Sequence, residues 1–215
     1  MRKRPNIFYY RLASLYDSFS AAEFKLGRSL VKRSALRPGE QILEVGCGTG
    51  RLLMEIARCV SPGGSATGVD LSEPMIRIAR SRAKKTKLEP AVQLLQGDLL
   101  NLPFGDETFD KVFSCFTLEL FPEADRLGAL KEMYRVLRPG GILAVASLNA
   151  HESPKLGERL YWWFHKTFPT LVDCRPIPVA TLIDRSPLKQ ISLEEKKLYG
   201  IPVALVLAKK PPLEG

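Results

Sequence analysis

The chain has 215 residues, of which 45% are hydrophobic and 26% are charged, and its formal net charge at pH 7 is +9. These proportions are ordinary for a soluble globular protein, and they provide enough apolar material for one full core. The longest apolar runs, such as Val203–Ala208, are far shorter than the ~20 residues of a membrane span, and the basic N-terminus lacks a secretory apolar run, so we expect a cytoplasmic protein.

Cysteine and histidine are too scattered to predict a metal site. The four cysteines form no CxxC pair, and only His151 and His165 could assist them in binding a metal. We therefore expect no zinc or disulfide framework, and the cysteines are predicted to be free thiols.

Positive charge is concentrated at the N-terminus. Residues 1–40 hold nine Lys or Arg residues against three acidic ones. This asymmetry favours an anionic partner, either membrane headgroups or nucleic acid, although a solvated basic helix face explains it equally well.

The first predicted element is an amphipathic helix over Ile7–Ser34 that is rich in aromatic residues. After it, short β-rich runs alternate with longer helical stretches, and this alternation predicts a parallel sheet with helices on both faces. The predicted strands are Gln41–Val45, Ser65–Asp70, Val92–Gln96, Lys111–Ser114 and Gly141–Ser147, and the predicted helices are Arg51–Cys59, Glu73–Ala83 and Ala124–Leu137.

The C-terminal part of the chain adds a different pattern. Lys189–Lys197 and Val203–Lys209 read as two strands joined by turn residues 199–202, which predicts an antiparallel hairpin at one edge of the sheet. An aromatic stretch, Ala150–Pro178, separates this hairpin from the strand before it, and we expect it to be an addition to the core fold.

The strongest functional signal runs from Glu44 to Gly50 and reads EVGCGTG. An apolar strand passes there into three alternating glycines and then into a helix. Glycines let a ligand approach bare backbone, and the first amides of the following helix face the edge where open α/β sheets bind ligands. Asp70 ends the second strand twenty residues after Gly50, a distance typical of a carboxylate that binds ribose hydroxyls.

These two features alone would also fit a dinucleotide-binding protein, but the finer pattern differs. The glycines follow GxGxG rather than GxGxxG, and Arg51 stands where the last glycine would be. A second carboxylate, Asp98, follows the third strand. Further ordered motifs lie at residues 102–104 and 109–114, and the sequence RVLRPGG (135–141) ends the next helix.

These motifs resemble those of the class I S-adenosylmethionine-dependent methyltransferases, in particular the branch that includes ubiquinone and menaquinone biosynthesis enzymes. The resemblance is close over residues 40–148 and looser at 16–17 and 172–176. It implies an α/β Rossmann-like fold, with a doubly wound, mostly parallel seven-stranded sheet and an antiparallel terminal hairpin. It also implies S-adenosylmethionine as the methyl donor, S-adenosylhomocysteine as the product, and no metal.

The resemblance also assigns roles to the motif residues. The methionine part of the donor would lie against the glycines, the ribose at Asp70, and the adenine between Leu71 and Asp98, while Ser114 would lie close to the sulfonium. Turn formation and helix capping are the alternative explanation of the same residues. The donor contacts implied in this way are Glu44, Gly46, Cys47, Gly48, Gly50, Asp70, Leu71, Asp98, Leu99 and Ser114.

Catalysis leaves a weaker signal, because in-line methyl transfer depends mainly on alignment and exclusion of water. The candidates for a general base are Glu119, which equally well decorates a helix surface, and His165, which as a lone histidine is more often only packed. Aromatic residues predict a small lipophilic acceptor, a quinone precursor or a phospholipid headgroup, although the same rings also serve to seat helices on the core. Candidate acceptor contacts are Tyr9, Tyr16, Phe116 and Tyr161.

We expect a single domain with four parts: an N-terminal helical lid (1–38), a donor-binding core (39–148), an acceptor-side insertion (149–180) and terminal strands (181–215). The lid is expected to touch an anionic membrane surface peripherally.

Other functions stay open at this point. The basic composition suggests an RNA or protein methyltransferase, but residues 114–117 differ from the Asn/Asp-Pro-Pro-aromatic motif that grips a base amine, so nucleic acid is not the expected partner. A non-catalytic donor-binding protein and a nicotinamide-dependent oxidoreductase are the remaining alternatives, and the glycine spacing disfavours the oxidoreductase.

Overall fold

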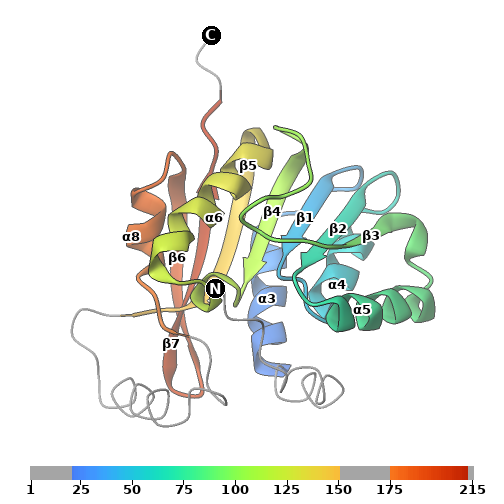
Figure 1. Cartoon of the computed structure of the whole chain (residues 1–215), viewed down its shortest axis with the longest axis horizontal. Coiled ribbons are helices and arrows are strands. Elements are labelled where there is room, and N and C mark those ends of the chain that lie inside the picture. Colours follow the sequence, from blue (N-terminus) through green and yellow to red (C-terminus); the bar gives the residue numbers. More distant parts are fainter. Residues whose placement is uncertain (1–20, 151–174, 213–215) are drawn as a thin grey trace.

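The computed structural model describes residues 21–150 and 175–212. Within these ranges, seven strands form one sheet that is flanked by helices (Figure 1). The strands are β1 (Gln41–Val45), β2 (Ser65–Asp70), β3 (Val92–Gln96), β4 (Phe109–Cys115), β5 (Leu137–Leu148), β6 (Lys189–Leu198) and β7 (Ile201–Lys209). The helices are α3 (Ala21–Arg33), α4 (Arg51–Val60), α5 (Glu73–Thr86), α6 (Glu123–Val136) and α8 (Val179–Asp184), together with the short 3₁₀ helices η1 (Glu89–Ala91) and η2 (Leu118–Leu120).

The sheet has the strand order β3-β2-β1-β4-β5-β7-β6. Strands β1 to β5 are mutually parallel, whereas β7 is antiparallel to both β5 and β6. The chain winds outward from β1 to β3 and then resumes at β4, on the other side of β1. This reversal puts the topological switch point at the carboxyl ends of β1 and β4, where open α/β sheets bind ligands. The predicted doubly wound sheet with an antiparallel terminal hairpin is confirmed.

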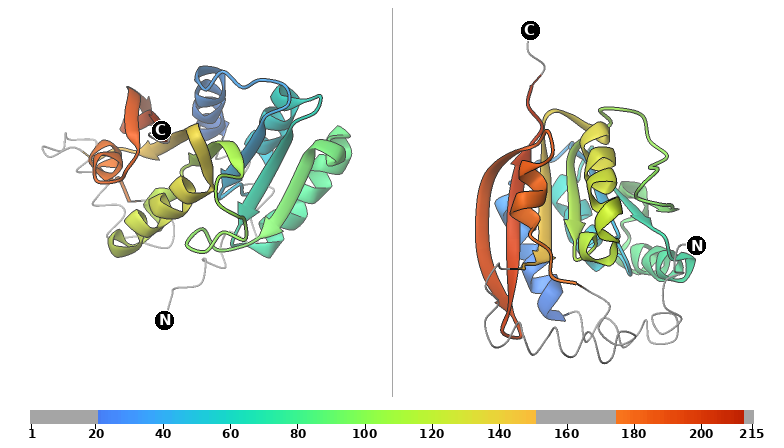
Figure 2. Two further views of the ribbon diagram at one scale, coloured as in Figure 1. Left: turned by 90° about the horizontal axis from the view of Figure 1, so that it is seen from above. Right: turned by 60° about the vertical axis from the view of Figure 1, so that its left-hand side comes forward.

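Helices cover both faces of the sheet (Figure 2), and two hydrophobic cores, one on each face, hold the layers together. On one face, α6 and α8 pack over residues that include Val112 of β4, and on the other, α3 and α4 pack over residues that include Phe113. Successive residues of a strand point to opposite faces. The side chain of Ser114 therefore lies on the α6 side of the sheet, and that of Cys115 lies on the α3 side.

Helix α3 is the described part of the helix predicted over Ile7–Ser34, and it packs against α4 and the sheet. The close approach to α4 depends on Gly27, where a Cβ would lie 3.0 Å from a methyl group of Leu52. In the described structure, this portion of the proposed lid is thus docked on the core.

The hairpin of β6 and β7 is tighter than the sequence predicts. β7 begins at Ile201, inside the expected turn, because Ile201 pairs with Leu198 across a two-residue connection. Both connecting residues, Tyr199 and Gly200, have positive φ, which is the geometry that two-residue hairpins favour.

Two other boundaries differ from the expected ones. β5 begins at Leu137 rather than Gly141, because Leu137 pairs with Phe109 ahead of an irregularity in the ladder. The sequence pattern does not predict α8, since six residues are too few for a helical period to be evident. No helix in the ranges 21–150 and 175–212 is long and apolar enough to cross a membrane.

Gly64, which precedes β2, provides a test of how closely the backbone packs at the amino edge of the sheet. A Cβ at Gly64 would lie 2.5 Å from the Glu40 carbonyl oxygen and 2.7 Å from that of Val60. Because neither oxygen belongs to a flexible side chain, we expect Gly64→Ala to lower the free energy of unfolding by about 1–3 kcal/mol.

Gly105→Ala is the matched control, since a Cβ at that position would meet only Thr108 Oγ1, at 3.8 Å. We expect this change to be neutral or to stabilise the protein by up to ~1 kcal/mol through the unfolded chain. Urea denaturation of both variants measures the difference, and equal midpoints would contradict the packing argument.

Candidate functional site

The glycine loop 46–50 connects the carboxyl end of β1 to α4. Its three glycines have positive φ, a conformation that L side chains rarely adopt. Packing also excludes a side chain at Gly46, because a Cβ there would overlap the side chain of Thr117. The Thr117 hydroxyl in turn donates to the Val45 carbonyl at 3.2 Å, so the segment after β4 is held against the end of β1.

Asp70, at the end of β2, fastens this loop to the neighbouring strand. Its Oδ2 accepts a hydrogen bond from the Gly48 amide, and its Oδ1 accepts one from the Ser72 amide, each at 2.8 Å. Burial raises the pKa of the Asp70 carboxyl, and the two amide hydrogen bonds oppose that rise. Since each carboxylate oxygen has more than one acceptor position, Asp70 can still accept a hydrogen bond from a ligand hydroxyl.

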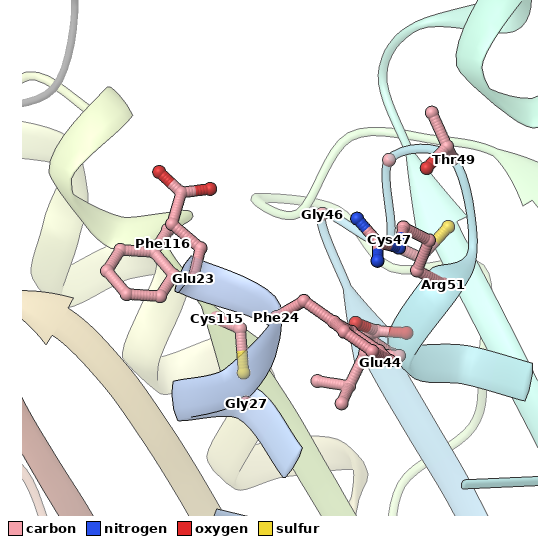
Figure 3. Close-up of a pocket in the computed structure, with 12 residues that line it drawn as sticks. Glu23, Phe24, Gly27, Glu44, Gly46, Cys47, Thr49, Arg51, Cys115 and Phe116 are labelled. Atoms are coloured by element: carbon pink, nitrogen blue, oxygen red, sulfur yellow. The ribbon is translucent and has the colours of Figure 1, made fainter. Parts of the chain in front are cut away.

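Glu44 brings a second carboxyl group to the same place. Its side chain is 3% exposed and lines a pocket bounded by the glycine loop and α3 (Figure 3). Among the described residues, Glu44 Oε2 and Ser114 Oγ are the buried side-chain polar atoms that have no hydrogen-bond partner. Burial, followed by the charge of Asp70, raises the pKa of Glu44 well above its usual range. A buried acceptor without a partner is costly, so this carboxyl fits a ligand that brings a cation or a hydrogen-bond donor.

The walls of the pocket come from α3, from the glycine loop and from the end of β4, which contributes Cys115 and Phe116. The centre of the Arg51 guanidinium lies 4.4 Å from the ring centroid of Phe24, which is cation–π geometry. In Figure 3, the Phe24 side chain projects from α3 toward Glu44 and Arg51. Helix α3 therefore closes one side of the pocket.

The predicted donor residues lie at or beside the carboxyl ends of four neighbouring strands, β1 to β4. Asp70 joins the pocket through its hydrogen bond to Gly48, whereas Leu71 and Asp98 follow β2 and β3 farther along the carboxyl edge. Leu71 is 52% exposed, and Asp98 Oδ1 accepts from the Leu100 amide at 3.0 Å. The predicted residues that line the pocket itself are Glu44, Gly46, Cys47, Gly48 and Phe116.

The structure does not bring every predicted residue to the pocket. Leu99 is buried in the core on the α6 side, and Ser114 is fully buried on that same side of β4. Ser114 thus points away from Cys115, its neighbour in the pocket wall. Four further candidates lie outside the described residues: Tyr9, Tyr16, Tyr161 and His165.

Sequence reasoning missed several residues that shape the site. The Arg82 guanidinium, on α5, donates to the carbonyl and to the hydroxyl oxygen of Thr49, at 2.8 and 2.9 Å, and so supports the glycine loop from outside. Thr117, Phe24 and Arg51 form the other contacts described above. These contacts join residues that are distant in sequence, so no local pattern indicates them.

Glu119 lies in η2, after β4, and its side chain is 1% exposed. The Ser147 hydroxyl donates to its Oε2 at 3.0 Å, and the Leu148 amide donates to its Oε1 at 3.2 Å. Burial raises the pKa of this carboxyl to about 7, hydrogen bonds oppose the rise, and the charge of Glu23 adds to it. The alternative that Glu119 decorates a helix surface is wrong, because the segment folds inward over the end of β5.

Glu119 is expected to make stability depend on pH. Its pKa of about 7 in the folded protein lies above the ordinary value of 4.5, so the folded protein binds this proton more tightly than the unfolded chain does. The contribution of Glu119 to the free energy of unfolding is therefore most favourable below pH 4.5. It falls as the pH rises from 4.5 to about 7 and is constant above that range.

Glu119→Gln tests this dependence, because Gln does not titrate yet can accept from the Leu148 amide and donate to Ser147 Oγ. Melting temperatures measured from about pH 5 to pH 8 should fall more steeply for the wild type than for the variant. Glu55→Gln, at a partly exposed position of α4, is the control and should keep the wild-type slope. Parallel curves for all three proteins would contradict the shifted pKa.

Comparison with known proteins places this site in a family. Residues 42–141 match a family described as a methyltransferase domain. The demethylmenaquinone methyltransferase of Symbiobacterium thermophilum is 36% identical over 170 residues, which covers 76% of this chain and 66% of the relative. The protein of the same name from Lactobacillus johnsonii is 33% identical over 147 residues, which covers 67% of this chain and 59% of the relative. The chain thus spans about six tenths of the length of these relatives.

Solved structures agree in fold. A SAM dependent methyltransferase from Aquifex aeolicus aligns with a TM-score of 0.66 and 22% identity, covering 89% of this chain and 93% of that one. A chain from the complex of the Haloferax volcanii Trm112 methyltransferase activator with a putative methyltransferase aligns with a TM-score of 0.76 and 18% identity. The alignment covers 97% of this chain and 100% of that one. The [4+2]-cyclase SpnF aligns with a TM-score of 0.71 and 22% identity, covering 88% of this chain and 82% of that one.

At these identities, the structural likeness shows the fold alone. The motifs at the ends of β1, β2 and β3, the matched domain and the curated relatives give the closer relationship. The chain belongs to the class I S-adenosylmethionine-dependent methyltransferases, and among them it resembles the menaquinone branch.

Proposed function

We propose that this protein transfers a methyl group from S-adenosylmethionine to a small lipophilic acceptor of the quinone-precursor class. The observation that carries the donor half is Glu44, a buried carboxyl whose Oε2 has no hydrogen-bond partner among the described residues, beside the glycine loop. The acceptor half rests on the relatives, which are named demethylmenaquinone methyltransferases.

The described residues fit the chemistry of the donor. The Glu44 carboxylate would accept from the ammonium of the methionine part, and this cation would relieve the cost of burying the charge. Asp70 would accept from the ribose hydroxyls with the acceptor positions that its amide hydrogen bonds leave over. Leu71 would offer an exposed apolar side chain to the adenine, and Asp98 would accept from the adenine amino group. When bound, S-adenosylmethionine supplies an electrophilic methyl group on a sulfonium.

The chain's own contribution to the reaction would be alignment and shielding. Phe24 and Phe116 supply apolar walls on two sides of the pocket. Such walls exclude water, which both competes as a nucleophile and screens the charges of the site. A site of this kind lowers the barrier chiefly by holding the nucleophile in line with the methyl carbon and the sulfur.

Glu119 is our candidate for the proton acceptor when the acceptor molecule reacts through a hydroxyl or a hydroxyl-activated carbon. Its carboxyl lies at the carboxyl ends of β4 and β5, and a pKa of about 7 leaves it partly ionised at neutral pH. A general base is most effective when its pKa is close to the working pH. Ser147 would hold the carboxyl in place through its hydrogen bond to Oε2.

The donor assignment predicts a selective effect of Glu44→Gln. Loss of the charge should weaken S-adenosylmethionine binding by about 1.5–3 kcal/mol, or roughly 10- to 150-fold, as for other hydrogen bonds between charged groups. Affinity for 5′-methylthioadenosine, which has no ammonium group, should stay within about twofold of wild type. Titration calorimetry with both ligands measures this contrast, and an equal loss for both would contradict the role given to Glu44.

The acceptor assignment predicts the product. Purified protein, labelled S-adenosylmethionine and reduced demethylmenaquinone in detergent should give the methylated quinol and S-adenosylhomocysteine in equal amounts, as measured by mass spectrometry. Parallel reactions contain phosphatidylethanolamine vesicles, total RNA or a protein extract in place of the quinone. If label is found only in one of those pools, the quinone assignment is wrong and that pool contains the acceptor. Donor binding without transfer to any pool would indicate a non-catalytic protein.

A further inference from the structure

The sequence RVLRPGG, residues 135–141, carries no part of the pocket described above. It joins the end of α6 to the beginning of β5, at the edge of the sheet opposite the glycine loop. Local backbone geometry explains its two glycines. Gly140 has a φ of +78°, and a Cβ at Gly141 would lie 2.8 Å from the Arg138 carbonyl oxygen. Arg135, in the last turn of α6, also makes contacts that extend beyond the helix.

The Arg135 guanidinium reaches from α6 into the loop that follows β3. Its Nη1 donates to the Phe104 carbonyl at 2.7 Å, and its Nη2 donates to the Leu102 carbonyl at 3.1 Å. Nη1 also donates to Asp106 Oδ1 at 2.9 Å. The main-chain carbonyl of Arg135 accepts from the Glu107 amide at 3.0 Å, so one residue contacts this loop at four places.

Glu132 completes the clamp from the preceding turn of α6. Its Oε1 accepts from Arg135 Nε and its Oε2 accepts from Nη2, both at 2.9 Å. The same Oε2 also accepts from the Leu102 amide at 2.9 Å. The Arg135 hydrogen bonds lower the pKa of Glu132, so this carboxylate stays charged and the pair keeps its two-pronged geometry. A lysine would supply charge but not the planar fork.

The clamped loop begins at the predicted adenine contact. Asp98 accepts from the Leu100 amide through Oδ1 and from the Asn101 amide through its carbonyl, at 3.0 Å each. One residue earlier, the Gly97 amide donates to the Asp70 carbonyl at 3.0 Å. The segment from Gly97 to Asn101 thus lies between Asp70 and the first residue that the Arg135–Glu132 clamp holds.

We propose that Arg135, together with Glu132, is a positioning residue for the adenosine part of the methyl donor: it fixes the 99–107 loop, and through that loop it holds Asp98 in place without touching the donor. This inference rests on the proposed function, because it takes S-adenosylmethionine as the ligand. A displacement of a ligand-contacting side chain by a fraction of an ångström affects ligand affinity, even when the residue that positions this side chain is remote from the ligand.

Arg135→Lys is the test, and Arg138→Lys is its matched control. Arg138 stands in the same motif and pairs with Asp110 Oδ1 at 2.6 Å, but among the described residues it forms no hydrogen bond or ion pair with the 99–107 loop. Arg135→Lys should weaken the binding of both S-adenosylmethionine and 5′-methylthioadenosine by about tenfold, whereas Arg138→Lys should change neither by more than about twofold. The KM for the donor should rise in parallel, with kcat at saturating donor within about twofold of wild type.

The pattern across ligands separates this role from others. Glu44→Gln should weaken only the ligand with an ammonium group, whereas Arg135→Lys should weaken both ligands equally. A lower melting temperature with unchanged 5′-methylthioadenosine affinity would overturn the inference and leave Arg135 with a structural role only. A wild-type protein that binds neither ligand would instead overturn the proposed function.

A milder variant covers the case in which Arg135→Lys does not fold. Asp106→Asn removes the charge of an exposed partner of Arg135 and leaves the main-chain contacts intact. It should weaken 5′-methylthioadenosine binding by about two- to threefold, and hydrogen exchange at residues 99–107 should become faster while exchange in β1 stays unchanged. Unchanged affinity together with faster exchange in the loop would also overturn the inference.

Discussion

The donor site depends on one residue, Asp70, that joins the carboxyl ends of three adjacent strands. Its two carboxylate oxygens accept from the Gly48 amide of the β1 loop and from the Ser72 amide of its own turn. Its main-chain carbonyl accepts from the Gly97 amide after β3. Since parallel strands end at one edge of the sheet, a residue at the end of the middle strand can reach one neighbour with its side chain and the other with its main-chain carbonyl. Thr117, through the Val45 carbonyl, and Arg82, through the Thr49 carbonyl, fix the glycine loop at its two ends.

Electrostatics at the pocket run opposite to the charge of the whole chain. The protein carries a formal net charge of +9, yet Glu44 lines the pocket and Asp70 joins it through Gly48, and burial raises the pKa of both carboxyls. Glu44 is also affected by the charge of Asp70, and Glu119 by that of Glu23. A ligand that carries an ammonium and a sulfonium stabilises the ionised form of the Glu44 and Asp70 carboxyls, whereas a nucleotide phosphate would destabilise it. The burial of the acids therefore favours the donor that the glycine spacing indicates.

The sequence predicts the donor half of the site better than the rest, and the reason is physical. Strand ends, positive-φ glycines and the acid after each strand are local features, so β1 to β4 and the Glu44, Gly48 and Asp70 cluster follow from pattern and spacing. The inward fold of Glu119 depends instead on Ser147 and Leu148, which lie about thirty residues away. The face on which Ser114 lies likewise depends on strand register.

The reaction itself is decided by a few side chains on a shared scaffold. A [4+2]-cyclase has the same fold, with a TM-score of 0.71, so the topology alone does not assign methyl transfer. Under the proposed function, Glu44 and Asp70 would select what binds, because they would meet a cationic donor and its sugar. Glu119 lies on the other side of the switch point, beyond β4, where its carboxyl can exchange a proton near neutral pH. Under the proposed function, the two halves would impose separate requirements: the β1–β3 side would determine donor affinity, and the β4–β5 side would determine which nucleophile can lose its proton.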